Sequence, residues 1–195
     1  MMRVLRALFG LLLAGMLLGS TQCQNTTNDG TNSDGPIFVT TLAVEDANGN
    51  AASSFSQGAE IQFVLSVRNR TSSSQTISFS TAQKYNFEVL DSGTATEAWT
   101  WSLGQSFTQS TTSLTFAAGE TQTFTVTWDQ VDDTDQPVPT GSYEVIGGMT
   151  CTNNSSSSSS SSTSTSSTCM PTGIPTSDQL VPSVYISTLV PFTIQ

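Results

Sequence analysis

The chain has 195 residues and a formal net charge of −10, with 15 acidic residues, five basic residues and no histidine. This acidic balance excludes nucleic acid as a partner, because binding it depends on Lys and Arg neutralising phosphates. Without histidine the chain lacks the usual general base and the commonest metal ligand, so Ser-His-Asp and Cys-His mechanisms are excluded and a non-enzymatic protein is expected.

The first 22 residues have the layout of a secretory signal peptide. Arg3 and Arg6 precede an apolar run over residues 7–18, which is too short for a membrane-spanning helix of about 20 residues. When these two arginines are removed, three basic residues remain against 15 acidic ones, a net charge of −12. An exported domain with an acidic, soluble surface is therefore expected.

Cys23 follows the predicted signal peptide directly. Its position resembles that of the lipid-modified cysteine of bacterial lipoproteins, although Gln22 is large for the preceding site. The alternative is ordinary cleavage, which would leave a free cysteine in the N-terminal tail. We expect lipidation, and with it a membrane anchor. Residues 23–35 have no apolar periodicity and are predicted to form a flexible tether.

From residue 36 onward, short segments alternate apolar and polar residues, which is typical of half-buried β-strands. Turn signals separate them, for example Asp91-Ser-Gly93 and Ala118-Gly-Glu120. Pro191 falls in the last segment and is tolerable on an edge strand. No window shows a helical period. The predicted strands are 37–45, 60–68, 76–79, 85–89, 98–101, 114–116, 121–128, 142–149 and 184–194.

This pattern predicts an all-β fold for residues 36–195, an immunoglobulin-like antiparallel β-sandwich. Aromatic side chains at alternate positions are expected to fill the core between its sheets. Trp99 and Trp101 are at alternate positions and so should face the same side of the sheet, and the same holds for Phe124, Val126 and Trp128. At least one member of each set is therefore expected between the sheets.

Residues 150–182 interrupt the strand pattern. Cys151 and Cys169 bracket 17 residues that are all Ser, Thr or Asn, a composition typical of a disordered insertion. A disulfide between these two cysteines would close the base of the insertion and fits an oxidising compartment. Two free thiols are the alternative. With both cysteines in a disulfide, no zinc site is predicted.

Charged side chains offer three further candidates. The aspartates of 129–135 could supply oxygen ligands to Ca²⁺, but their spacing fits no EF-hand and a solvated turn is favoured. Glu88 and Glu97 could form a carboxylate pair on neighbouring strands, although exposed strand charges are the favoured interpretation. Lys84, the single lysine, could act as the specificity residue of a trypsin-type inhibitor, and a solvated lysine at a strand edge is favoured.

Several short motifs follow one another in a fixed order. They are Gln83-Lys-Tyr-Asn-Phe87, Trp99-Thr-Trp-Ser102 with Phe107-Thr-Gln109, Gly119-Glu120, Thr127-Trp128 and Pro139-Thr-Gly-Ser-Tyr143. As an ordered set over about residues 37–149, they resemble the BsuPI family of bacterial proteinase inhibitors. The resemblance implies an immunoglobulin-like sandwich and a proteinase partner. The founding members are intracellular, and this chain departs from them in its signal peptide, Cys23 and Ser-rich insertion.

The residues that carry this resemblance are interpreted as core aromatics and turn formers, so they indicate a fold and not a reactive site. We expect an exported, lipid-anchored, non-catalytic domain without cofactor that binds a protein through a loop or an exposed strand edge. The alternative is a structural or adhesive cell-envelope module without inhibitory activity. The motif residues are Tyr85, Phe87, Trp99, Trp101, Phe107, Gly119, Trp128, Gly141 and Tyr143.

Overall fold

The computed structural model describes residues 36–151 and 186–195. The predicted signal peptide, Cys23, the tether and Cys169 lie outside these residues, as does most of the predicted insertion. All regular structure in the described part of the chain is β-strand, in ten segments. The strands are β1 (Phe38–Asp46), β2 (Ser54–Phe55), β3 (Ile61–Asn69), β4 (Gln75–Phe79), β5 (Tyr85–Asp91), β6 (Thr96–Thr100), β7 (Thr112–Phe116), β8 (Thr121–Trp128), β9 (Gly141–Met149) and β10 (Val190–Ile194).

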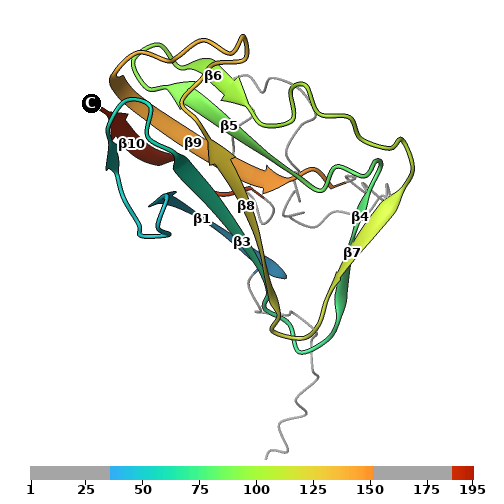
Figure 1. Cartoon of the computed structure of the whole chain (residues 1–195). Helices are drawn as coiled ribbons and strands as arrows, with labels where there is room; N and C mark the ends of the chain where they lie inside the picture. The colour runs from blue at the N-terminus through green and yellow to red at the C-terminus, as the bar shows by residue number, and fades with distance from the viewer. Residues whose placement is uncertain (1–35, 152–185) are drawn as a thin grey trace, which may run out of the picture. The chain divides into compact units, whose positions relative to one another are not determined.

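These strands form two facing sheets and a ribbon. One sheet has the order β1-β3-β8, the other has the order β2-β10-β9-β5-β6, and β4 pairs with β7 in the ribbon. All pairings are antiparallel except that of β2 with β10, which is parallel. In Figure 1 the ribbon rises opposite β3 and β8. The predicted all-β sandwich is confirmed.

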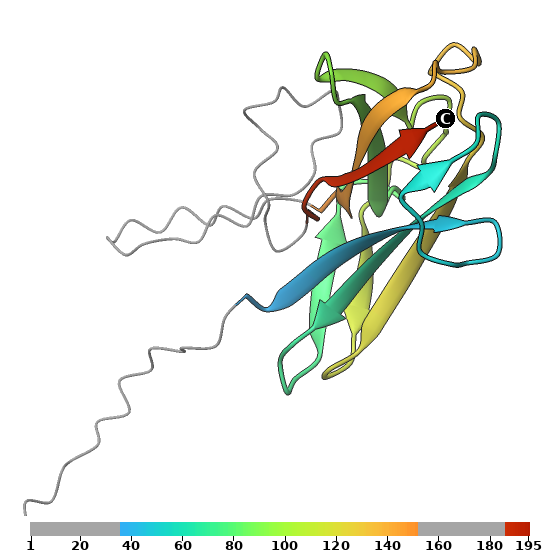
Figure 2. The same ribbon diagram turned by 90° about the vertical axis from the view of Figure 1, so that its left-hand side faces the viewer.

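The predicted strands agree with the observed ones to within a few residues, with two differences. The two-residue strand β2 was not predicted, and β10 begins at Val190, later than the predicted start at residue 184. Figure 2 shows β10, in red, between β9 and the short β2. Because β2 pairs only with Thr193 and Ile194, Pro191 has no ladder partner on that side, as its missing N–H requires.

The core lies between the two main sheets. Alternate residues of β3 from Ile61 to Val67 are fully buried, as the period of two predicts. Phe63 of β3 stacks on Phe87 of β5, with ring centroids 6.2 Å apart, and on Trp128 of β8 at 5.9 Å. Burying a side chain of this size stabilises the fold by about 1.5 to 3 kcal/mol. The aromatic motif residues therefore join the two sheets.

Both predicted sets of core aromatics, that of Trp99 and that of Trp128, place a ring in this core. Trp128 is only 1% exposed, and its indole N–H donates to the Val131 carbonyl at 2.7 Å. Trp99 is partly buried and lies 6.2 Å from Phe63 and 5.9 Å from Trp128, measured between ring centroids. The expectation that each set places a member between the sheets is confirmed.

The other motif residues form turns and corners. The buried Tyr143 donates its hydroxyl to the Pro139 carbonyl at 2.7 Å, the arrangement of the tyrosine corner in immunoglobulin-like sandwiches. Gly141 begins β9, two residues before Tyr143. Gly119 has φ 72° in the turn before β8, a backbone region that side chains disfavour. The interpretation of these motifs as core aromatics and turn formers therefore agrees with the structure.

Candidate functional site

One loop exposes a large apolar side chain. Residues 101–111, which we call the 101–111 loop, connect β6 to β7. Leu103 lies in this loop and is 59% exposed, and the other exposed large apolar residues of the described chain are Ile37 and Leu189. Single exposed apolar residues are common on protein surfaces, but a leucine on a connecting loop offers apolar area that a partner can contact.

Hydrogen bonds fix both ends of the 101–111 loop. At its start, the Trp101 N–H donates to the Phe87 carbonyl at 3.0 Å, and the Ser102 N–H donates to Asn86 Oδ1 at 3.1 Å. Toward its end, the Thr108 carbonyl accepts from the Ala82 N–H at 2.9 Å. These bonds attach the loop to β5 and to the segment before β5. The backbone on either side of Leu103 is therefore held in place.

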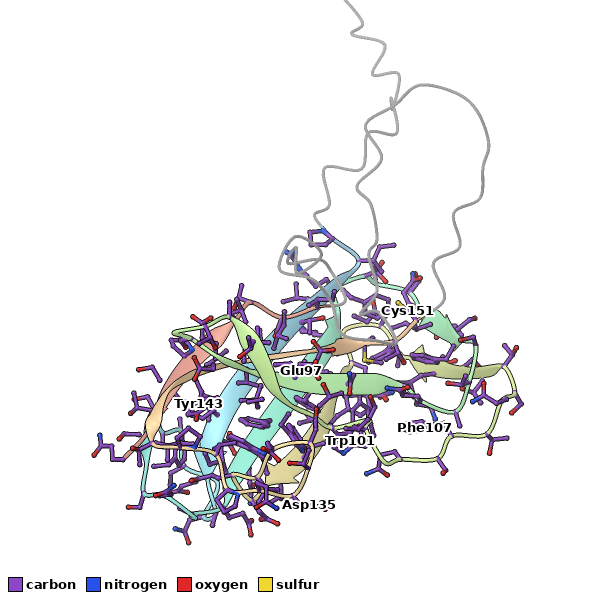
Figure 3. The ribbon with its side chains drawn as sticks, turned by 90° about the horizontal axis from the view of Figure 1, so that it is seen from above. Glu97, Trp101, Phe107, Asp135, Tyr143 and Cys151 are labelled. Atoms are coloured by element: carbon purple, nitrogen blue, oxygen red, sulfur yellow. The ribbon has the colours of Figure 1, made fainter. Side chains whose placement is uncertain are left out.

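Stacked aromatic rings hold the 101–111 loop against β5. Trp101 stacks on Tyr85 with ring centroids 4.6 Å apart, and Phe107 packs on Trp101 at 5.8 Å. Tyr85 also lies 4.9 Å from Phe124 of β8. Burial raises the pKa of the Tyr85 phenol, which keeps this ring neutral. Trp101 and Phe107 lie near each other in Figure 3. The motif residues of this region therefore form the platform of the loop.

Lys84 is a poor candidate for a reactive residue. It lies directly before β5 and is half-buried, and its carbonyl accepts from the Thr150 N–H at 3.1 Å. A reactive residue needs an exposed backbone that a proteinase can reach. The structure therefore favours the structural interpretation of Lys84 at the end of a strand.

The prediction that Glu88 and Glu97 are exposed strand charges is wrong for Glu88. The Glu88 side chain is 0% exposed, and Glu97 is partly buried. Among the described residues, three buried side-chain atoms have no hydrogen-bond partner, and they are Glu88 Oε2, Glu97 Oε2 and Thr100 Oγ1. All three lie on the adjacent strands β5 and β6, so the alternative of a carboxylate pair describes the structure better.

A β-bulge brings these groups to one face of the sheet. Val89 pairs with Trp99, whereas Leu90 pairs with Glu97, so Ala98 is the extra residue on β6. With strict alternation, Glu97 would share the inner face with Trp99. The bulge reverses that parity, and directly opposed residues of antiparallel strands share a face. Glu97 and Thr100 therefore lie on the outer face with Glu88, and Figure 3 labels Glu97 on β6.

The buried pair has shifted protonation. Burial, and after it the negative charge of Glu97, raises the pKa of Glu88 from 4.5 to about 8, while a hydrogen bond from Asn86 opposes the shift. Burial also raises the pKa of Glu97; the nearby Thr100 hydroxyl opposes this and Asp133 adds to it. Near neutral pH Glu88 is therefore mostly a neutral carboxylic acid.

The aspartates of 129–135 form a hydrogen-bonded turn. Asp132 Oδ1 accepts from the Thr134 N–H at 2.8 Å and the Gln136 N–H at 3.0 Å, and Asp133 Oδ1 accepts from the Thr100 N–H at 2.9 Å. Over residues 36–151 and 186–195, no group of three or more His, Cys, Asp and Glu side chains is arranged to hold a metal ion. The hydrogen bonds of Asp132 therefore agree with the interpretation of this segment as a turn.

Three residues in these regions were missed by the sequence analysis. Leu103 was not singled out, although a lone leucine before Gly104 in a stretch without alternation is a signal of an exposed turn. Asn86 and Gln130 are buried polar residues; the Gln130 amide donates to the Ser56 and Ala59 carbonyls at 2.9 and 2.8 Å. No sequence pattern marks such tertiary hydrogen bonds.

Cys151 follows β9 and is buried. Its predicted partner Cys169 lies outside the described residues, so the disulfide between them stays a prediction. Within residues 36–151 and 186–195 the structure contains no helix with the length and apolar character of a membrane span.

The family comparison covers most of the sandwich. The model of the BsuPI family, described as an intracellular proteinase inhibitor, matches residues 48–158. The chain belongs to the BsuPI family. The match includes β2 to β9 and both regions described above, the 101–111 loop and the Glu88–Glu97 pair. Strands β1 and β10 lie outside the matched residues and complete the two sheets.

Solved structures show only distant likeness. A β-glucosidase, EmGH1 from Erythrobacter marinus, aligns with a TM-score of 0.40 and 11% identity over 81% of this chain and 15% of its own. The CARDB domain of PF1109 from Pyrococcus furiosus aligns with a TM-score of 0.36 and 8% identity, over 81% of this chain and 87% of its own. The sporulation control protein Spo0M from Bacillus subtilis aligns with a TM-score of 0.36 and 12% identity over 80% of this chain and 49% of its own. No curated protein sequence matches the chain.

Proposed function

We propose that this protein is a non-catalytic inhibitor that binds a proteinase through the 101–111 loop. Membership of the BsuPI family is the observation that supports an inhibitor-type function, and the exposure of Leu103 on a loop fixed at both ends selects the contact surface. A loop held in one conformation loses little conformational entropy on binding, which favours affinity.

The loop is a better binding surface than the edge of the neighbouring strand. β6 is the last strand of the five-stranded sheet, and strand addition to it would need free backbone groups along this edge. The Thr100 N–H on β6 already donates to Asp133 Oδ1. The side chain of Asp133 therefore covers part of this edge. Natural proteins commonly protect an edge strand in such a way, which prevents it from pairing with the strand of another chain.

An inhibition assay tests the role of the loop. We expect the full-length protein to inhibit at least one member of a panel of serine proteinases, and Leu103→Asp to weaken this inhibition about tenfold or more, since a charge in an apolar contact is costly. Ile37→Asp is the matched control, because Ile37 is 49% exposed but lies directly before β1, outside the loop. It should leave inhibition unchanged.

Two results would contradict this proposal. Absence of inhibition across the panel would favour the alternative of a structural or adhesive envelope module. Equal inhibition by wild type and Leu103→Asp would retain an inhibitor but remove the 101–111 loop as its contact surface. Circular dichroism on each variant keeps a loss of binding separate from a loss of fold.

We further propose that the domain acts outside the cytoplasm, attached to the membrane through lipid on Cys23. The support comes from the sequence, in which an arginine-flanked apolar run ends shortly before this cysteine. Cys23→Ser should move the protein from the membrane fraction to the soluble fraction in its native host. If partitioning does not change, the lipid anchor is refuted, whatever the result of the inhibition assay.

A further inference from the structure

One side chain connects the buried carboxyl pair to the 101–111 loop. Asn86 is 1% exposed, and its Oδ1 accepts from the Ser102 N–H at 3.1 Å. Its Nδ2 donates to Glu88 Oε1 at 3.3 Å. Because a backbone N–H can only donate, the amide oxygen of Asn86 must face Ser102 and the amide NH₂ must face Glu88. One amide group therefore links Glu88 to the first residues of the loop.

The ionisable groups around Glu88 are acidic on each neighbouring element. Glu97 on β6 raises its pKa, and Asp133 in the loop between β8 and β9 lies against Glu97 and Thr100. On β9 the residue opposite Glu88 is the apolar Ile146, and Glu144 lies two pairs further along, opposite Leu90. No cation is among the groups that shift the pKa of Glu88. A negative charge on Glu88 would therefore be neither hydrated nor paired with a positive charge.

We propose that Asn86 and the Glu88–Glu97 pair form a pH-sensitive latch at the base of the 101–111 loop, closed while Glu88 is neutral and loosened when it ionises. Its biological meaning rests on the proposed function, because the loop is the surface assigned there to the proteinase. Asn86 is a positioning residue in this latch, since it acts on the loop through the Ser102 N–H.

The physical reason is the cost of a buried charge. Neutral Glu88 can stay in its dry position with Oε2 unpaired, at the cost of one missing hydrogen bond. Ionised Glu88 beside Glu97 must regain water, and water enters only if β5, β6 or their covering residues move apart. Asn86 is hydrogen-bonded to the moving carboxyl group, so its bond to Ser102 weakens with the same motion. The loop then loses one of the bonds that fix its base.

Amide hydrogen exchange of residues 101–111 in the full-length protein tests the latch. After correction for intrinsic exchange, protection of the wild-type loop should fall about tenfold between about pH 6 and about pH 10. Glu88→Gln keeps the shape of the side chain without its charge, so its loop should keep constant protection. The control Glu60→Gln removes an exposed carboxylate and should behave like wild type.

A second variant decides the question if Glu88→Gln does not fold. Glu97→Gln removes the negative neighbour of Glu88 and should move the midpoint of the wild-type transition to lower pH. The latch is overturned if wild type shows constant protection, if Glu88→Gln shows the wild-type fall, or if Glu97→Gln leaves the midpoint unchanged. These readings concern the loop alone, so they do not depend on whether any proteinase binds.

Discussion

The two faces of β5 are both buried, but for opposite chemical reasons. Phe87 and Val89 face inward and pack among the aromatic rings that join the sheets. Asn86 and Glu88 face outward and are equally inaccessible, yet one Glu88 oxygen has no partner. Burial of the inner face stabilises the fold, whereas burial of the outer face costs free energy. Burial alone therefore does not tell which residues hold a protein together.

The two faces of β5 should also respond differently to truncation of side chains and to pH. Apolar contacts between the sheets do not titrate, so the inner face should respond to truncation and not to pH. The outer face holds a carboxylic acid with a pKa of about 8, so it should respond to pH and tolerate neutral substitutions. Strongly shifted carboxyl groups are more frequent at functional sites than elsewhere.

The largest effect is expected on the inner face, from Trp128→Ala. Trp128 is 1% exposed and contacts rings from both sheets, so its truncation should lower the free energy of unfolding by about 3 to 5 kcal/mol. A domain of this kind has only about 5 to 15 kcal/mol in total. Denaturant titration measures the loss, with Lys84→Ala as a control expected to stay within about 0.5 kcal/mol of wild type. Equal stability of Trp128→Ala and wild type would refute the core assignment.

A smaller loss in the free energy of unfolding is expected from Gly147→Ala, because the inner face has no room for an additional atom at this position. A Cβ at Gly147 would lie 2.9 Å from Phe87 Cδ1 and 3.3 Å from Leu65 Cδ1, closer than such atoms tolerate. Gly147→Ala should therefore cost about 1 to 3 kcal/mol through overpacking. Thermal unfolding would show this as a lower melting temperature. A melting temperature equal to or above that of wild type would mean that the two sheets are less closely packed at this point.

On the outer face, Glu88→Gln should stabilise the protein, and only above acidic pH. The unfolded chain releases the Glu88 proton near pH 4.5, whereas the folded protein keeps it to about pH 8. Between these values the folded state binds more protons, so the free energy of unfolding falls as pH rises. Gln does not ionise and so removes this fall, which should give a gain on the order of 1 to 3 kcal/mol at pH 8 and above. A variant less stable than wild type at every pH would contradict the prediction.

The smallest effect is expected at an exposed polar contact of the β4–β7 ribbon. Thr76 and Thr115 lie opposite each other, and their hydroxyl oxygens are 2.9 Å apart. Because both side chains are exposed, Thr76→Ala should lower the free energy of unfolding by only about 0.2 to 1 kcal/mol. Denaturant titration of both variants checks this, and a loss as large as that of Gly147→Ala would show that polar contacts on the surface matter as much as the core.

The inner face could be predicted from the sequence, and the outer face could not. Alternation of Tyr85, Phe87 and Val89 marks one face of a strand, and the hydrophobic effect then decides which side is buried. The same alternation assigns Glu88 to solvent, because it contains no information on what covers the second face of a sheet. The bulge at Ala98 changes the parity of Glu97 without any Gly to mark it.

The candidate binding surface was predictable only in part. The motif residues Trp101 and Phe107 were recognised from their order, and they lie within the 101–111 loop, where their rings pack on each other. Leu103 is marked only by the glycine that follows it, and the role of Asn86 depends on its tertiary hydrogen bond with Ser102, which no local pattern specifies. Resemblance to a family therefore located the region, and the structure supplied the exposure of Leu103 and the hydrogen bond from Ser102 to Asn86 on which the two proposals rest.

Titration of the Glu88 carboxyl group by carbon-13 NMR tests most directly whether the outer face of β5 is a buried polar layer. The protein is labelled at its glutamate side chains, and Glu88→Gln assigns the resonance by its disappearance. The structure predicts a midpoint at about pH 8 for Glu88, far above the ordinary value of 4.5. A midpoint near 4.5 would show that Glu88 is hydrated, and would contradict both the buried layer and the latch built on it.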